Sequence, residues 1–172
     1  NRMKSYKNLS FIDNDRFHHE ELGFNYRMTN IQAAIGLGQI EKIEEIINFK
    51  RKIGDLYKKK LSEIPNLRFH REHESSFLVY WMYCIQLTKN NLNAKIVMAQ
   101  LEKEGVGCRP FFKGLHLQPA LKNLAISKGS FKNTEDAYNY GFYLPSGMQM
   151  NEEKVNYVVS VLKKTLQKLS YI

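Results

Sequence analysis

The sequence has few cysteines and no long apolar segment. Its two cysteines, Cys84 and Cys108, lie at no zinc-ligand or redox-motif spacing, so we expect two reduced, mostly buried thiols. No apolar run approaches the roughly 20 residues that cross a membrane. Residues 1–10 also lack the apolar core of a signal peptide. These absences predict a cytoplasmic protein with no membrane partner.

The common catalytic motifs are also missing. There is no Gly-x-Ser-x-Gly, no Walker loop, no paired-carboxylate pattern and no evident nucleophile–base pair. The stretch His18-His19-Glu20-Glu21 lacks the i, i+4 spacing of helical metal ligands, so we expect no metal site there. Nothing in these 172 residues therefore predicts a complete active site.

The size and charge are those of a basic globular domain. The chain is 43% hydrophobic and 12% aromatic, which is enough for a core, and its net charge is +9. That charge suits a polyanion such as nucleic acid, an anionic surface or a phosphate-bearing ligand. However, Lys50-Arg51-Lys52 and Lys58-Lys59-Lys60 fall in a predicted helix, which spreads each run around its axis and indicates an ordinary solvated surface.

A long helix is predicted after residue 28. Thr29 and Gln32 form a capping box that starts it. Apolar residues then follow largely helical spacing to about Glu63, where Pro65 stops the helix. Such a rod would be about 50 Å long. We expect it to bridge domains or subunits.

Small residues within this helix predict a close contact. Gly36 and Gly38 each weaken a helix by about 1 kcal/mol relative to alanine. Together with Ala33 and Ala34 they form a smooth surface. We expect another backbone to approach it.

Strands and helices alternate in the rest of the chain. Val, Tyr, Trp and Phe are dense between Phe77 and Leu87, which predicts a long strand with Trp81 and Tyr83 in the core. Asn151 is a good N-cap for a terminal helix. Further strands are expected at 67–70 and 106–109, and further helices at 93–104, 119–127 and 134–140. The pattern predicts an α/β or α+β fold.

Two stretches carry candidate binding residues. Asn25 and Arg27 precede a helix N-terminus, where anions bind readily. The alternative is a surface turn in which Arg27 pairs with an acid such as Glu20 or Glu21. In "CRPFFKGLHLQP", Arg109 and His116 lie in a rigid, aromatic, basic segment that suits a ligand wall, or else an ordinary connecting loop.

Four stretches, in order, resemble one family. They are "GFNYRMTNIQAAIGLGQIEKIEEI", "YWMYCIQL", "LEKEGVGCRPFFKGLHLQP" and "GFYLPSG", the last followed by the terminal helix. The pattern resembles the C-terminal region of the DegT/DnrJ/StrS sugar aminotransferases, and within them the perosamine-synthase-like 4-aminotransferases. These enzymes use pyridoxal phosphate (PLP) to move an amino group from glutamate to a keto sugar on a nucleoside diphosphate, for surface polysaccharide biosynthesis.

The resemblance implies a small C-terminal domain of a fold-type I, aspartate-aminotransferase-like transferase. It implies a long bridging helix plus a small, mostly antiparallel sheet covered by helices. Residues 1–28 would be the tail of the PLP-binding large domain or a dimer-contact segment, and residues 29–172 the bridging helix and the small domain. Family members are about twice as long, and their Schiff-base lysine lies in the large domain. We therefore expect this chain alone to be inactive and to hold no PLP.

The resemblance also implies roles for the candidate residues. Asn25 matches the asparagine that reaches the PLP phosphate of the partner subunit in a homodimer. Arg27, Arg109 and His116 match positions near the substrate. Two other interpretations remain open at this point. The charge and aromatic content suit a basic nucleic-acid-binding domain, and the long helix suits a non-catalytic dimerisation module.

Overall fold

A computed structural model describes residues 2–12, 15–69, 71–89, 91–124 and 129–172. The chain forms two compact units, Asn1–Ile43 and Glu44–Ile172. The division expected at residue 28 concerns the link to a large domain and stays a prediction. None of the helices described is long and apolar enough to cross a membrane.

The N-terminal unit has little interior. It contains α1 (Arg2–Tyr6), the antiparallel pair β1 (Phe11–Ile12) and β2 (Asp15–His19), and α2 (Asn30–Ile40). Among the residues of this unit whose burial is described, only Ser10 is buried. The unit therefore does not bury an apolar core of its own, although such burial is the main stabilising term in folding.

The expected long helix is interrupted. The capping box of Thr29 and Gln32 forms as predicted, but α2 ends at Ile40 and the next helix, α3, spans Ile43–Leu61. At the junction the Lys42 amide donates to the Gln39 carbonyl at 3.2 Å, an i→i−3 bond that tightens the turn. The prediction of one rod to Glu63 is wrong. No residue of α2 is buried, so packing does not offset the low helix propensity of its two glycines.

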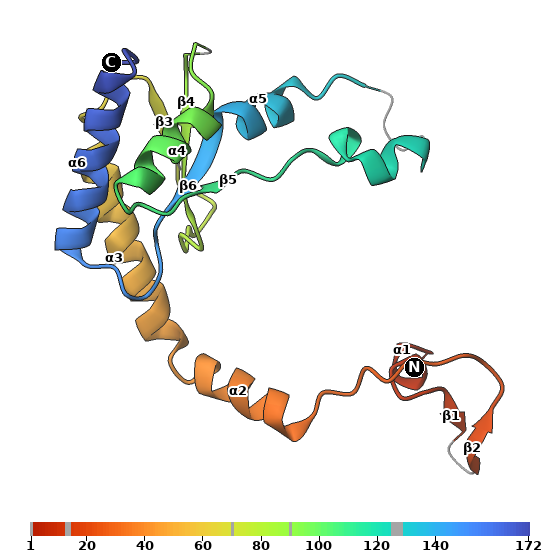
Figure 1. The fold of residues 1–172 in the computed structure, drawn as a ribbon. Helices are drawn as coiled ribbons and strands as arrows, with labels where there is room; N and C mark the ends of the chain where they lie inside the picture. Colours follow the sequence, from red (N-terminus) through yellow and green to blue (C-terminus); the bar gives the residue numbers. More distant parts are fainter. Residues whose placement is uncertain (1, 13–14, 70, 90, 125–128) are drawn as a thin grey trace. The chain divides into compact units, whose positions relative to one another are not determined.

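The C-terminal unit is built on a four-stranded antiparallel sheet. Its strands are β3 (Leu67–Phe69), β4 (Tyr83–Leu87), β5 (Arg109–Pro110) and β6 (Gly141–Leu144), in the spatial order β3-β4-β6-β5 (Figure 1). In β4 the burial alternates between full and partial, as a strand with two different faces requires. The prediction of a mixed α/β fold with a small antiparallel sheet is confirmed.

One face of this sheet forms the core. Tyr83, Ile85 and Phe142 are at most 1% exposed, and the register places all three on that face. Helices α3, α4 (Ala94–Lys103) and α6 (Glu152–Lys168) contribute the remaining core side chains, and α4 packs against α6. The rings of Tyr57 and Tyr83 stack at 4.7 Å.

One further α-helix and two short 3₁₀ helices complete the described part of the C-terminal unit. Helix α5 (Lys132–Tyr140) contacts β4 and β6, and two short 3₁₀ helices, η1 (Leu115–Leu117) and η2 (Pro119–Leu124), precede it. The predicted N-cap at Asn151 is confirmed, because its side-chain oxygen begins α6. Asn93 begins α4 in the same way, at the start of the helix expected at 93–104. Local side-chain chemistry thus sets the helix starts.

The long predicted strand is half its expected length. It begins at Tyr83 rather than Phe77, and Tyr80 has a positive φ of 48° that interrupts the extended backbone. Trp81 is 69% exposed, so its expected core position is wrong. The backbone of this segment bonds to side chains instead of a strand, since the Leu78 carbonyl accepts from Arg51 and the Trp81 carbonyl from Lys50.

Neither cysteine forms a disulfide. Burial raises the pKa of Cys84 to about 11 and that of Cys108 to about 12, so both are protonated at neutral pH. They are half-buried rather than fully buried. Within the described residues, no group of three or more His, Cys, Asp or Glu side chains could hold a metal ion.

Candidate functional site

The segment from Phe24 to Arg27 is a fixed, extended piece of chain. The Phe24 amide donates to the Tyr6 carbonyl at 2.6 Å, and the Tyr26 amide donates to the Lys7 carbonyl at 2.9 Å. Gly23 makes this pairing possible, because a Cβ there would collide with the backbone of Leu9. The segment is therefore positioned by backbone bonds, not only by the helix that follows.

The two faces of this segment differ. Phe24 and Tyr26 stack on each other at 5.2 Å, and the alternation of an extended chain separates them from Asn25 and Arg27. Arg27 donates to Asn8 Oδ1 at 3.3 Å, and Asn8 forms a β-bridge with Asn25. The structure thus groups Asn8, Asn25 and Arg27. No local sequence pattern indicates Asn8, since only the pairing of distant backbone segments brings it here.

Asn25 keeps its amide available. Its side chain is exposed and makes no hydrogen bond to the residues that the structure describes. Among the described residues Arg27 does not form the alternative ion pair with Glu20 or Glu21. The Glu21 carboxylate instead lies 3.7 Å from the Arg2 guanidinium. An amide beside a guanidinium suits the oxygens of a phosphate such as that of PLP. These residues fit part of a phosphate anchor.

A pocket of about 330 Å³ lies in the C-terminal unit. Its walls come from α3 (Lys50), the segment before β4 (Trp81), β5 (Arg109), β6 (Tyr143) and the following turn, 145–147. Arg109 pairs directly with Tyr143 across the sheet, so both lie on one face. That face is opposite the one on which Phe142 enters the core. The pocket therefore lies at the end of the sheet where β4 begins and β6 ends, with Arg109 and Tyr143 on the face that the core leaves free and Lys50 reaching it from α3.

Two cations with different surroundings line this pocket. The exposed Arg109 guanidinium makes no hydrogen bond or ion pair within the described part of the chain. Lys50 Nζ donates to the Trp81 carbonyl at 3.0 Å and to the Ser146 carbonyl. Burial lowers the pKa of Lys50. The sequence analysis assigned Lys50 to a solvated helix face, and no local pattern distinguishes it from Lys52.

His116 lies apart from Arg109. Its side chain is 12% exposed, its Nε2 is 3.0 Å from Glu135 Oε1 and its ring packs 4.7 Å from that of Phe131. It does not line the pocket that contains Arg109. The structure therefore places the two residues in different surroundings, and their expected substrate roles stay predictions.

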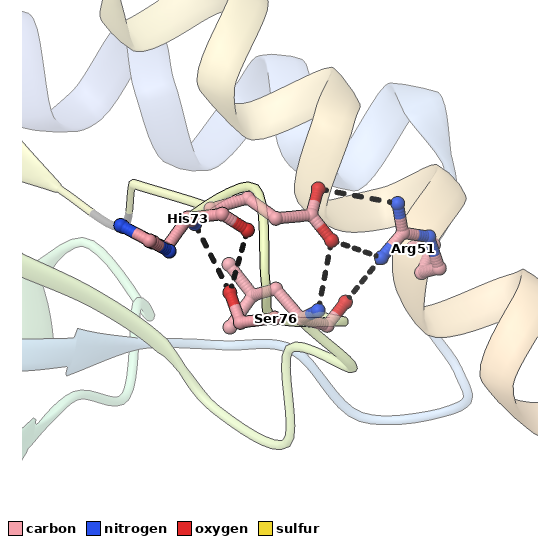
Figure 2. Close-up of polar contacts among 5 residues, drawn as sticks. Arg51, His73 and Ser76 are labelled. Atoms are coloured by element: carbon pink, nitrogen blue, oxygen red, sulfur yellow. Dashed lines mark hydrogen bonds and ion pairs between the residues drawn. The ribbon is translucent and has the colours of Figure 1, made fainter.

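A polar clamp holds the residues that lead to Trp81. Arg51 Nη1 and Nη2 donate to the two Glu72 carboxylate oxygens at 2.8 Å and 3.3 Å, and Nη1 also donates to the Leu78 carbonyl at 2.7 Å. The Leu78 amide returns a bond to Glu72 at 2.8 Å. Figure 2 shows these contacts beside the tight turn in which His73 and Ser76 bond to each other. Two neighbouring residues of α3, Lys50 and Arg51, thus fix one loop, residues 71–82.

Acid should open this clamp. The Arg51 bond and the Leu78 amide lower the pKa of Glu72 to about 2, from an ordinary 4.5. A carboxylate whose pKa is lowered in the folded state stabilises that state at any pH above its ordinary pKa. This stabilisation is lost as the pH falls through the lowered pKa. We expect the hydrogen-exchange protection of the Leu78 amide to fall severalfold between pH 4.5 and pH 2.

A matched pair of variants checks this. Glu72→Gln should lower the Leu78 protection at neutral pH and remove its acid dependence. Glu74→Gln, in the same loop and without a bond to Arg51 among the described residues, should leave both unchanged. Equal losses in the two variants would contradict the clamp.

Comparison with known proteins identifies the chain. The model of the DegT/DnrJ/EryC1/StrS aminotransferase family matches residues 1–163. The chain belongs to this family. The sequence-based recognition is confirmed, and PLP-dependent sugar aminotransferases are the family's enzymes.

Relatives of known name agree. GDP-perosamine synthase of Vibrio cholerae is 32% identical over 158 residues, which is 91% of this chain and 42% of the relative. GDP-perosamine synthase of Caulobacter vibrioides is 30% identical over 168 residues, or 96% of this chain and 44% of the relative. The chain thus spans less than half the length of these family members.

Solved structures share the fold. The aminotransferase TlmJ of Streptoalloteichus hindustanus matches 98% of this chain and 45% of its own length, with a TM-score of 0.86 and 20% identity. Helicobacter pylori PseC, an aminotransferase of pseudoaminic acid biosynthesis, matches 97% of this chain and 46% of its own, also at a TM-score of 0.86. At this identity the likeness establishes the fold alone.

Proposed function

We propose that this chain is the C-terminal part of an aminotransferase that moves an amino group from glutamate, through PLP, to a keto sugar on a nucleoside diphosphate. The observation that carries the proposal is the family match over residues 1–163. The names of the perosamine-synthase relatives support a 4-amino sugar for surface polysaccharide as product. Family membership favours this interpretation over a nucleic-acid-binding domain.

Asn25 is proposed to anchor the cofactor. Its free amide would donate to the PLP phosphate of the partner subunit, and Arg27 beside it would add positive charge near the substrate. PLP, when bound, supplies the electron sink for amino transfer. Arg109 and His116 are proposed as substrate-side residues, with the Glu135 carboxylate holding the His116 ring.

A homodimer is part of the proposal. Ile31 and Ile35 of α2 are each at least 66% exposed, and their spacing of four residues places them on one side of the helix. Exposed apolar faces of this kind mark interaction surfaces. The small residues Gly36 and Gly38 leave room for a close approach, since a Cβ at either would meet nothing of this chain within 4 Å.

The reading frame upstream of Asn1 provides the first test. We expect it to encode a PLP-lysine domain, with the boundary to residues 29–172 near residue 28. The longer protein should then release 2-oxoglutarate from glutamate when given a nucleoside-diphosphate 4-keto sugar. An unrelated frame, or no turnover with any such sugar, would overturn the proposal.

Substitution of Asn25 tests the assigned role. A hydrogen bond to a charged group contributes about 1.5–3 kcal/mol, so Asn25→Ala in the longer protein should weaken PLP binding by about tenfold or more. Asn156→Ala, on the exposed side of α6, should leave it unchanged. We also expect the 172-residue chain alone to be inactive, and a visible absorbance band of protein-bound PLP formed by it would contradict this.

A further inference from the structure

The pocket beside Arg109 brings together two cationic side chains and one aromatic side chain. Arg109 with its free guanidinium, the half-buried Lys50 and the exposed Trp81 line one concave space of about 330 Å³. This volume lies at the lower end of the range of small-molecule sites, about 300–1,000 Å³. The three groups come from β5, α3 and the 71–82 loop, so only the folded unit brings them together.

The two cations suit a multiply charged anion. Arg109 has no partner among the described residues, so its planar fork of N–H donors is open to oxygens. Lys50 uses two of its three N–H donors on the Trp81 and Ser146 carbonyls. The third donor remains for a ligand. Paired guanidinium and ammonium groups of this kind bind phosphate oxygens.

The indole suits an aromatic ring. Trp81 is 69% exposed, which is unusual for the largest apolar side chain, and its backbone is nevertheless held by Lys50. The Arg51–Glu72 clamp fixes the same loop at Leu78. The backbone of the loop is thus fixed where Trp81 lines the pocket, which lowers the ordering cost of binding. Aromatic side chains held in this way stack on nucleobases, and every base offers a face for stacking.

We propose that Lys50 and Arg109 bind the diphosphate of a nucleoside diphosphate in this pocket, with Trp81 stacking on its base. The inference rests on the proposed function and assigns the nucleotide part of that substrate to these three residues. It adds Lys50 and Trp81, which neither the sequence analysis nor the resemblance placed at a site. It requires no cofactor and no partner subunit.

The chain carries its own reporter for this test, because Trp81 is its only tryptophan. We expect GDP and UDP, added to the 172-residue chain, to change the Trp81 fluorescence saturably. Guanosine without phosphate and inorganic pyrophosphate should each bind at least tenfold more weakly than GDP. Glutamate should give no saturable change.

Three variants separate the charges from the fold. Arg109→Gln should weaken GDP binding at least tenfold, and since the Arg109 side chain is exposed and unpaired within the described residues, its loss should not disturb folding. Lys50→Gln should do the same, and Lys50→Arg should restore part of the affinity. As a control, Lys163→Gln removes an exposed charge of α6 and should change nothing. Circular dichroism should show the same fold in all four proteins.

The binding measurements test the nucleotide pocket independently of the aminotransferase function. Equal GDP binding by wild type and Arg109→Gln, equal binding of guanosine and GDP, or no saturable fluorescence change would overturn it. The proposed aminotransferase function would survive that result, because 2-oxoglutarate release by the longer protein tests it separately. Conversely, GDP binding without turnover would retain the pocket and remove the aminotransferase proposal.

Discussion

Phe142→Ala should lower the free energy of unfolding of the C-terminal unit by about 3–5 kcal/mol. Phe142 is 0% exposed and lies on the central strand β6, between β4 and β5. Truncation removes apolar contacts and leaves a cavity that the paired backbone on both sides cannot close. Urea unfolding followed by far-UV circular dichroism measures the change.

Phe112→Ala is the matched control. The same residue type is 73% exposed at this position, where its ring makes an edge contact with Tyr143 at 6.3 Å between centroids. Surface substitutions of this kind usually change stability by less than about 0.5 kcal/mol, with an aromatic contact adding about as much again. Similar losses in the two variants would mean that Phe142 does not lie in the core described here.

Gly54→Ala should destabilise the same unit by about 1–3 kcal/mol, although alanine favours helices. A Cβ at Gly54 would lie 2.5 Å from Cγ of Tyr80, and the Tyr80 ring is itself 4% exposed. That ring stacks on Tyr83 at 5.7 Å, so it cannot move without disturbing the core. The clash should exceed the gain in helix propensity, which is about 1 kcal/mol. The urea midpoint measures the balance.

Gly36→Ala provides the contrast. It is also a helical glycine, but a Cβ at this position would have no neighbour within 4 Å, so α2 should gain helix content with no steric cost. Far-UV circular dichroism should increase in helical signal while the urea midpoint stays the same. A stabilised Gly54→Ala variant would show that the Tyr80 ring is free to move, and would contradict the packing.

Local signals predicted the helix starts well. Thr29, Asn93 and Asn151 each begin a helix through a side-chain oxygen, and this chemistry depends on residues two or three positions away. Val155, Val158 and Leu162 follow helical spacing and are buried along one side of α6. Ile96 shows the limit of such patterns, because it keeps helical spacing and is 49% exposed. Spacing identifies an apolar stripe but not where the neighbouring elements end.

Features that depend on contacts between distant residues could not be predicted from the sequence. No local pattern indicated the break after Ile40, and no residue of α2 is buried. The shortened strand β4 depends on Arg51 and Glu72 bonding to Leu78, and Arg51 lies far from the other two along the chain. Trp81 was expected inside because aromatic residues usually are, and these contacts hold it outside.

By itself, the sequence determined the family, the mixed α/β class and the helix caps at Thr29 and Asn151. All of these depend on short stretches of residues whose order is read directly. Only the tertiary structure decided which charges meet. Lys50 and Arg109 lie far apart in the sequence, and they line one pocket because antiparallel register and the packing of α3 bring them to the same end of the sheet, where β4 begins and β6 ends. Side-chain contacts across such distances depend on the packed core, which no local pattern encodes.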